Sequence, residues 1–265
     1  MRQEETRRST GRRALRGVAV LAMVPACGLL LATAAYADVT TVTGSAFGES
    51  VSVTTALGVA VNSGPMPTVT LPAGGSATPV VNSAASVNTP VLTTGVLNVS
   101  TQGTPGPSGS VTSSTSVTNP KVGIAVVAPN LVTATTVTST CTSDQTGSTG
   151  SATIAGLTVL GSPVSVSTAP NSTLNIANVG ILHVNEQTVT GSAPSSGITV
   201  NALRLEINAG PLGGGSIIIG QSVCGVTGTG TATPTGAVGG VMLTGLVAVA
   251  FGGYQLRRRR RPSES

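Results

Sequence analysis

The densest group of side chains able to do chemistry lies between His183 and Gln187, where a histidine, a carboxylate and two amides follow one another. His183 is the only histidine of the chain, and it alternates with Ile181 along a predicted strand, which favours a structural role. We expect Asn185 and Gln187 to hydrogen-bond neighbouring backbone at the end of that strand. The sequence contains no Gly-x-Ser-x-Gly turn for a nucleophilic serine, which disfavours a Ser–His–carboxylate triad.

Metal binding and acid–base catalysis would draw on few residues. Calcium prefers six to eight oxygen ligands, and only Asp144, Glu186 and Glu206 could bring charge to this region, so a calcium site stays an alternative if the fold gathers them. The same carboxylates could serve a glycoside hydrolase, but their spacing selects no pair. One histidine and two cysteines cannot supply four zinc ligands, which disfavours a zinc site. Lys121 follows a proline and no glycine-rich turn precedes it, which disfavours a phosphate-binding loop. We therefore expect no catalytic residue, no cofactor and no metal.

The cysteines indicate an oxidising compartment. The chain has three, and if Cys27 is removed with the N-terminal segment, Cys141 and Cys224 remain. An even number in an exported protein predicts a disulfide between them, with two free buried thiols as the alternative.

The N-terminus, 1–37, has the form of a signal peptide. Six arginines precede an uncharged run that ends in Ala-Tyr-Ala, which predicts cleavage between Ala37 and Asp38. Two arginine pairs leave the twin-arginine route open beside general secretion, and Cys27 loosely imitates a lipoprotein site.

The C-terminus predicts a membrane anchor. Residues 236–256 carry no charge, and about 21 residues in a helix would cross the roughly 30 Å of bilayer hydrocarbon. A basic stop-transfer sequence follows, made of Arg257, Arg258, Arg259, Arg260 and Arg261. Such a flank predicts a cytoplasmic tail at 257–265, with the N-terminus outside and a short spacer at 229–235. A buried helix of a soluble domain is the alternative.

The region between these ends predicts an all-β, antiparallel, sandwich-like extracellular domain over 38–228. Val and Thr dominate, and Gly, Pro, Ser and Asn interrupt the chain at intervals of roughly 8 to 12 residues. Only Lys121 and Arg204 are basic between residues 38 and 234, so a nucleic-acid partner is not expected. The acidic residues there are Asp38, Glu49, Asp144, Glu186 and Glu206. Because Phe47 is the only Phe, Tyr or Trp in this region, the core must be aliphatic.

Two stretches rich in Ser, Thr, Pro and Gly are predicted to be irregular. We interpret 102–120 as an exposed loop or an interdomain linker, and expect loops at 72–85 and 101–120 to carry recognition. Within a strand predicted at 198–207, the apolar alternation changes phase near Ala202. A bulge there would turn both apolar sets toward one core, and a strand buried on both faces is the alternative. Arg204 and Glu206 would then lie on the exposed face as a solvated pair.

Several segments carry a family resemblance. They are Val-Thr-Ser-Thr-Cys at 137–141, Gly-Ser at 150–151, Ile-Ala-Gly-Leu-Thr-Val at 154–159, Ala-Pro-Asn at 169–171, Val-Asn-Glu-Gln at 184–187, Ile-Thr-Val-Asn-Ala-Leu at 198–203, Ile-Ile-Ile-Gly-Gln-Ser-Val-Cys at 217–224 and, upstream, Gly-Pro-Met-Pro-Thr-Val-Thr-Leu-Pro at 64–72. In their order and spacing they resemble the secreted bacterial choice-of-anchor P family. The resemblance implies one surface-displayed domain with a variable C-terminal anchor and no established activity. The chain departs from a sortase signal, since it has only Thr-Pro-Thr-Gly at 233–236, which favours a retained span.

These observations favour a structural or interaction protein displayed on a Gram-positive-type cell surface. Its partners would be the membrane, through the C-terminal span, and an envelope or extracellular protein or glycan. An extracellular ligand- or glycan-binding module is the second hypothesis, and an envelope hydrolase is the third.

Overall fold

The computed structural model describes residues 38–55, 58–124, 128–165, 167, 169–208 and 213–230. The predicted signal peptide, most of the spacer, the apolar segment at 236–256 and the arginine run lie outside the described residues. Within the described part, no helix has the length and apolar character needed to cross a membrane.

The described chain is all-β, as predicted, and every strand pairing in it is antiparallel. Its strands are β1 (Asp38–Thr54), β2 (Ala60–Thr70), β3 (Ser76–Ala84), β4 (Leu92–Thr93), β5 (Leu97–Thr104), β6 (Ser110–Thr118), β7 (Lys121–Ile124), β8 (Ala128–Thr133), β9 (Thr136–Asp144), β10 (Gly147–Ala155), β11 (Thr158–Val159), β12 (Ser162–Pro163), β13 (Ser172–Ile176), β14 (Gly180–Ser192), β15 (Ser195–Ile207) and β16 (Gly214–Thr229). β-branched residues favour such strands because their side chains suit a pleated surface.

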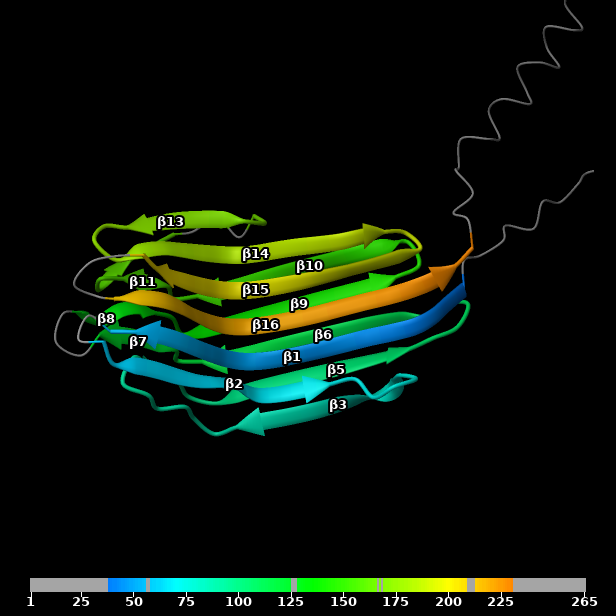
Figure 1. Cartoon of the computed structure of the whole chain (residues 1–265), viewed down its shortest axis with the longest axis horizontal. Helices are drawn as coiled ribbons and strands as arrows, with labels where there is room; N and C mark the ends of the chain where they lie inside the picture. Colours follow the sequence, from blue (N-terminus) through cyan, green and yellow to red (C-terminus); the bar gives the residue numbers. More distant parts are fainter. Residues whose placement is uncertain are drawn as a thin grey trace, which may run out of the picture. The chain divides into compact units, whose positions relative to one another are not determined.

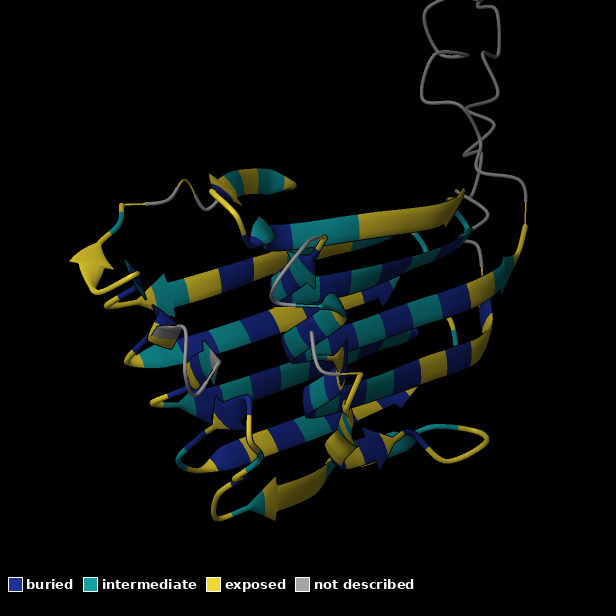
Figure 2. Cartoon of the chain, turned by 60° about the vertical axis from the view of Figure 1, so that its left-hand side comes forward, coloured by how far each residue is buried: buried dark blue, intermediate teal, exposed yellow. Residues whose placement is uncertain are grey.

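The strands form two layers (Figure 1). The first layer is one six-stranded sheet in the order β13-β14-β15-β16-β1-β2. The second layer contains two five-stranded sheets, ordered β10-β9-β6-β5-β3 and β12-β11-β8-β7-β4. Strands alternate between buried and exposed residues along most of their length (Figure 2), as expected when each sheet buries one face and hydrates the other.

The two sheets of the second layer are halves of one creased sheet. β6 leads directly into β7, β8 into β9 and β10 into β11, and backbone hydrogen bonds bridge the junctions, among them Gly95 N–H to Thr118 O at 2.8 Å. Asn119 has φ of 46° and precedes Pro120, and Gly156 has φ of 62°. Proline cannot continue a ladder, and a positive φ turns the chain, so both sites end a strand and redirect it.

The six-stranded sheet has a matching crease. In four adjacent strands two consecutive residues are buried where the alternation changes phase: Val184-Asn185, Ala202-Leu203, Ile219-Gly220 and Gly48-Glu49. The predicted phase change near Ala202 is therefore confirmed, and both apolar sets of β15 face the core. The mechanism differs from a single bulge, because the register of β15 with β14 and β16 is the same on both sides of Ala202. These four strands change phase in step, so none of them needs an extra residue relative to its neighbours among the four, whereas β2 carries one, because its register with β1 shifts between Glu49 and Val51.

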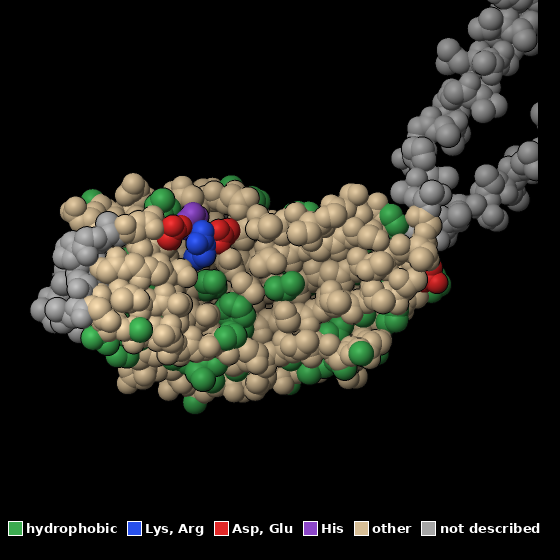
Figure 3. All heavy atoms as spheres, in the orientation of Figure 1, with side chains coloured by type: hydrophobic (Ala, Val, Ile, Leu, Met, Phe, Trp, Pro, Cys, Tyr) green, Lys and Arg blue, Asp and Glu red, His purple; other side chains and the backbone are tan. Residues whose placement is uncertain are grey.

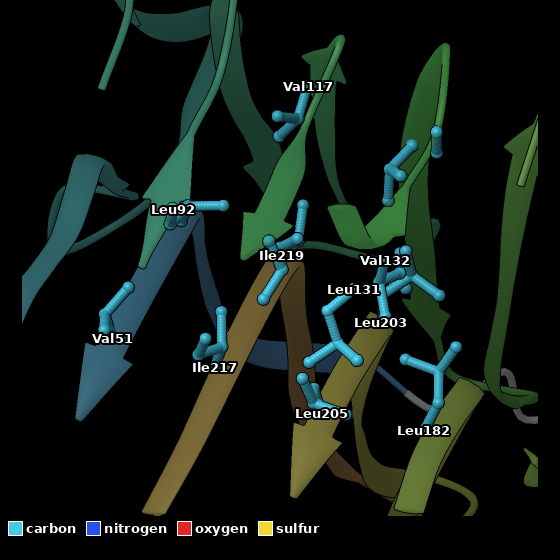
Figure 4. Close-up of a cluster of buried hydrophobic side chains, with 14 of the residues drawn as sticks. Val51, Leu92, Val117, Leu131, Val132, Leu182, Leu203, Leu205, Ile217 and Ile219 are labelled. Carbon is cyan, nitrogen blue, oxygen red and sulfur yellow. The ribbon is translucent and has the colours of Figure 1, made fainter. Parts of the chain in front are cut away.

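The interior tapers from one end to the other. At the end where β7 and β8 face β15 and β16, the core is built of leucine, isoleucine and valine (Figure 4). At the other end the layers approach closely, since the Cα atoms of Cys141 and Cys224 are 5.9 Å apart where stacked sheets usually lie about 10 Å apart. A smaller apolar cluster surrounds the disulfide at this end, with Val111, Ile198 and Val200 among its members. Buried hydroxyls lie beside it, and Thr101 and Ser113 share a buried hydrogen bond of 2.8 Å.

The predicted disulfide between Cys141 and Cys224 is confirmed, and it joins β9 of one layer to β16 of the other. The stretch 102–120 was wrongly predicted as a loop or linker, since it completes β5 and contains β6, the central strand of its sheet. β6 buries Val111, Ser113, Thr115 and Val117 in strict alternation, so the hydroxyls of Ser113 and Thr115 are interior groups, while its other hydroxyl residues lie on the outer face. The stretch 72–85 likewise contains β3.

Candidate functional site

A network of charged and amide side chains lies on the outer face of the six-stranded sheet, centred on Arg204 and Glu186. Arg204 Nε lies 2.9 Å from Glu186 Oε2, and Arg204 Nη2 lies 2.9 Å from Glu186 Oε1, so the guanidinium donates a hydrogen bond to each carboxylate oxygen. The register of β14 and β15 brings the two residues together, because His183 is paired directly with Arg204 and Glu186 with Asn201. Such a bidentate pair is among the stronger hydrogen-bonded ion pairs in proteins.

Two amides extend the network across the sheet. Asn201 Nδ2 donates to Glu186 Oε2 at 2.8 Å, and Gln221 Nε2 donates to Asn201 Oδ1 at 2.7 Å. Asn201 is thus held at both ends of its amide, which fixes the direction of its remaining N–H.

His183 and Glu206 complete the charged group. Arg204 Nη1 lies 3.5 Å from Glu206 Oε2, and His183 Nε2 lies 3.4 Å from the same oxygen. The predicted solvated pair of Arg204 and Glu206 was therefore an incomplete description, because the closer partner of Arg204 is Glu186 on the neighbouring strand. Figure 3 shows these charged side chains gathered in one place on this face.

The electrostatics of the network keep Glu186 ionised. Burial raises the pKa of Glu186, but hydrogen bonds from Arg204 and Asn201 and the nearby positive charge outweigh it, so its pKa is lowered overall. A carboxylate with a lowered pKa and these donors in place is a poor proton donor at neutral pH. Its arrangement suits the positioning of Arg204 and Asn201 more than acid–base catalysis.

Gln187 and Asn185, predicted to bond backbone, tie the two layers together at one edge. Gln187 Nε2 donates to the carbonyl oxygen of Gly150 on β10 at 2.8 Å and to Asn185 Oδ1 at 2.8 Å. The prediction of bonds to neighbouring backbone at a strand end is not confirmed, because the backbone that Gln187 bonds belongs to the other layer and both residues lie within β14, which continues to Ser192. Asn82 of β3 makes the equivalent bond at the opposite edge, to the carbonyl oxygen of Thr68 on β2, at 2.8 Å.

Asp144, the third carboxylate considered for calcium, is the last residue of β9, next to the turn into β10. There it accepts hydrogen bonds from the N–H and the hydroxyl of Thr146, at 2.7 and 2.6 Å. Among the described residues, no group of three or more His, Cys, Asp or Glu side chains is arranged to hold a metal ion.

Two residues with unusual surroundings gave no signal in the sequence. Phe47 lies on the outer face, since its neighbours Ala46 and Gly48 are buried, so the only Phe, Tyr or Trp among the described residues is not part of the core. Glu49 is fully buried at the crease, where Ser63 Oγ donates to its Oε1 at 2.9 Å and its Oε2 has no hydrogen-bond partner. Burial raises the pKa of Glu49, and the bond from Ser63 offsets this only in part.

Comparisons with known proteins give no relative from which a role could be transferred. Neither the family models, nor the curated proteins, nor the solved structures gave a match to this chain.

Proposed function

We propose that this chain is a structural or interaction protein displayed on the surface of a Gram-positive-type cell, where it acts by contact. The proposed layout is a signal peptide at 1–37, a β-sandwich domain, and an anchor at 236–256 retained by the arginine run at 257–261. Support comes from the charge pattern of the two ends, from the resemblance to the choice-of-anchor P family and from the disulfide, which is typical of exported proteins.

The observation that carries the contact role is a hollow of about 410 Å³ on the five-stranded sheet of β3, β5 and β6. Its lining is uncharged, and consists of Val81, Asn82, Ser83, Asn98, Val99, Ser100, Ser114, Thr115 and Ser116. Rows of hydroxyls continue from it across the outer face, such as Ser114 beside Thr140 and Thr140 beside Ser151. A broad neutral surface of hydroxyls and amides offers many hydrogen bonds with little desolvation of charge, which suits recognition of a protein or glycan partner.

Two of the three strands that line the hollow lie in the stretches that the sequence indicated for recognition, and the third, β5, contributes Asn98, Val99 and Ser100 from outside them. Residues 72–85 and 102–120 contribute β3 and β6, so the recognition hypothesis is retained while its structural form changes from loops to a sheet face.

The contact role can be tested with full-length protein on intact cells. Asn98→Arg places a charge in the hollow, and Thr149→Arg places the same charge on the exposed edge strand β10, away from it. Asn98→Arg should abolish capture of the envelope or extracellular partner in a pull-down, whereas Thr149→Arg should not. Equal capture by both variants would contradict a contact surface at the hollow.

Display can be tested separately by adding protease to intact cells. It should remove residues 38 to about 234 and leave a small membrane-bound fragment. Release of the full-length mature protein by mild salt would contradict the proposed anchor.

A further inference from the structure

The outer face of the six-stranded sheet carries a row of four side chains from four adjacent strands. Glu186 of β14 pairs with Asn201 of β15, Asn201 with Gln221 of β16, and Gln221 with Phe47 of β1. Three strand spacings of about 4.8 Å make this row about 14 Å long. It lies in the layer opposite the hollow described above.

Phe47 supplies an apolar platform at one end of the row. It is half-buried, and Ile218 and Val223 of the adjacent strand β16 are half-buried on the same face. Figure 3 shows hydrophobic side chains beside the charged group on this face. An aromatic ring placed outside an aliphatic core contributes nothing to the packing of that core, and a partly exposed ring is a frequent element of binding sites.

The amides supply fixed polar groups beside that platform. Asn201 accepts from Gln221 and donates to Glu186, and Glu186 is held in turn by Arg204. These bonds use one N–H of each amide, so the second N–H of Asn201 and both the carbonyl oxygen and second N–H of Gln221 remain for a ligand. Because the chain of hydrogen bonds fixes their directions, little side-chain entropy is lost when a ligand binds.

We propose that this row is a binding site for a neutral pyranose sugar, with the apolar face of one ring on Phe47 and its hydroxyls on Gln221 and Asn201. A sugar ring combines an apolar face with an edge of donors and acceptors, which is the pattern that the row presents. An anionic ligand fits less well, because Glu186 and Glu206 already neutralise Arg204, the one cation of the network. The inference goes beyond the contact role, since it assigns a small-ligand site to the other layer.

The test uses the full-length protein and two soluble probes, the β-1,4-linked tetramers of glucose and of N-acetylglucosamine. Titration calorimetry should detect binding of at least one tetramer, and the side-chain amide NMR signals of Asn201 and Gln221 should shift on titration. Phe47→Ala should weaken binding roughly tenfold, the loss of about 1.4 kcal/mol expected for an aromatic contact. Phe47→Tyr should keep it, and Thr188→Ala, a control on the same face of β14, should leave it unchanged.

Three outcomes would overturn the proposal of a sugar site. Failure of both tetramers to bind at millimolar concentration would remove the sugar assignment, as would equal affinity of wild type and Phe47→Ala. If the protein binds no sugar and Phe47→Ala abolishes binding of a protein partner, the row is part of a protein interface instead. The result is separable from the contact role, because Asn98→Arg alters the hollow and should leave tetramer binding intact.

Discussion

Removal of the disulfide should have the largest effect on stability of any change at the narrow end of the sandwich. The perturbation is Cys141→Ala combined with Cys224→Ala in the full chain. The bond closes a loop spanning 83 residues, and the chain-entropy relation gives about 4.5 kcal/mol of stabilisation for a loop of that size. The bridge lies within a small apolar cluster at this end, which includes Val111, Ile198 and Val200, so the double variant also leaves the space of two buried sulfur atoms unfilled.

Urea unfolding followed by far-ultraviolet circular dichroism measures the effect. A loss of about 4.5 kcal/mol should lower the midpoint by roughly 2 M, and the slope should rise because the unfolded chain expands without the crosslink. Wild-type protein under reducing conditions should approach the double variant. A loss below about 1 kcal/mol with an unchanged slope would refute the entropic argument for this bond.

Three further changes probe the buried carboxylate, the ion pair and the crease. Glu49→Met should raise the free energy of unfolding at pH 7 by about 1–3 kcal/mol, because it removes an unpaired buried oxygen. Because the folded-state pKa of Glu49 is raised, the stability of the wild type should fall as pH rises above 4.5. A variant less stable than the wild type at pH 7 would show that the carboxylate has a partner. Arg204→Leu should lower the free energy of unfolding by about 1–2 kcal/mol at pH 7. Because the folded-state pKa of Glu186 is lowered, the stabilisation from its ion pair is lost as pH falls below 4.5, so the stability difference between variant and wild type should shrink in acid. A stability difference that stays constant in acid titrations would argue against the pair. Gly220→Val should lower the stability measured by thermal unfolding by roughly 2–4 kcal/mol, because φ is 73° at this position and a Cβ would lie 2.9 Å from Thr115 Oγ1. An unchanged melting temperature would mean that the backbone at the crease adapts to the new side chain without strain.

Much of the fold followed from local pattern. The abundance of Val and Thr, the spacing of turn residues and the parity of the cysteines predicted an antiparallel all-β domain with its disulfide. The phase change at Ala202 was also visible in the sequence, because a one-residue change of alternation has few explanations in a strand. β6 was not predicted, because a strand made of Ser and Thr with two valines has the composition of a loop. Two of its hydroxyl residues, Ser113 and Thr115, are interior, and the facing layer is close enough for Ser113 Oγ to donate to the carbonyl oxygen of Val223 at 3.0 Å.

The candidate site shows the limit of sequence reasoning more clearly. Arg204 and Glu186 are separated by 18 positions, and only the pairing register of β14 and β15 makes them neighbours. The row from Glu186 to Phe47 spans strands from the two ends of the domain, so no local window contains it. Glu206 was visible as a partner for Arg204 because it is two positions away in the same strand, and it proved to be the more distant contact.

The position of the disulfide also has a mechanical consequence. The first and last residues of the described strands lie side by side, since Asp38 of β1 pairs with Thr229 of β16. A force applied beyond Thr229 would pull β16 out of the sheet from that end, breaking its pairs with β1 and β15 one after another. Cys224 lies only five positions before Thr229, and its bond to Cys141 would pass the load to the other layer after that short stretch. The domain would therefore resist unzipping under tension as long as its crosslink stays oxidised.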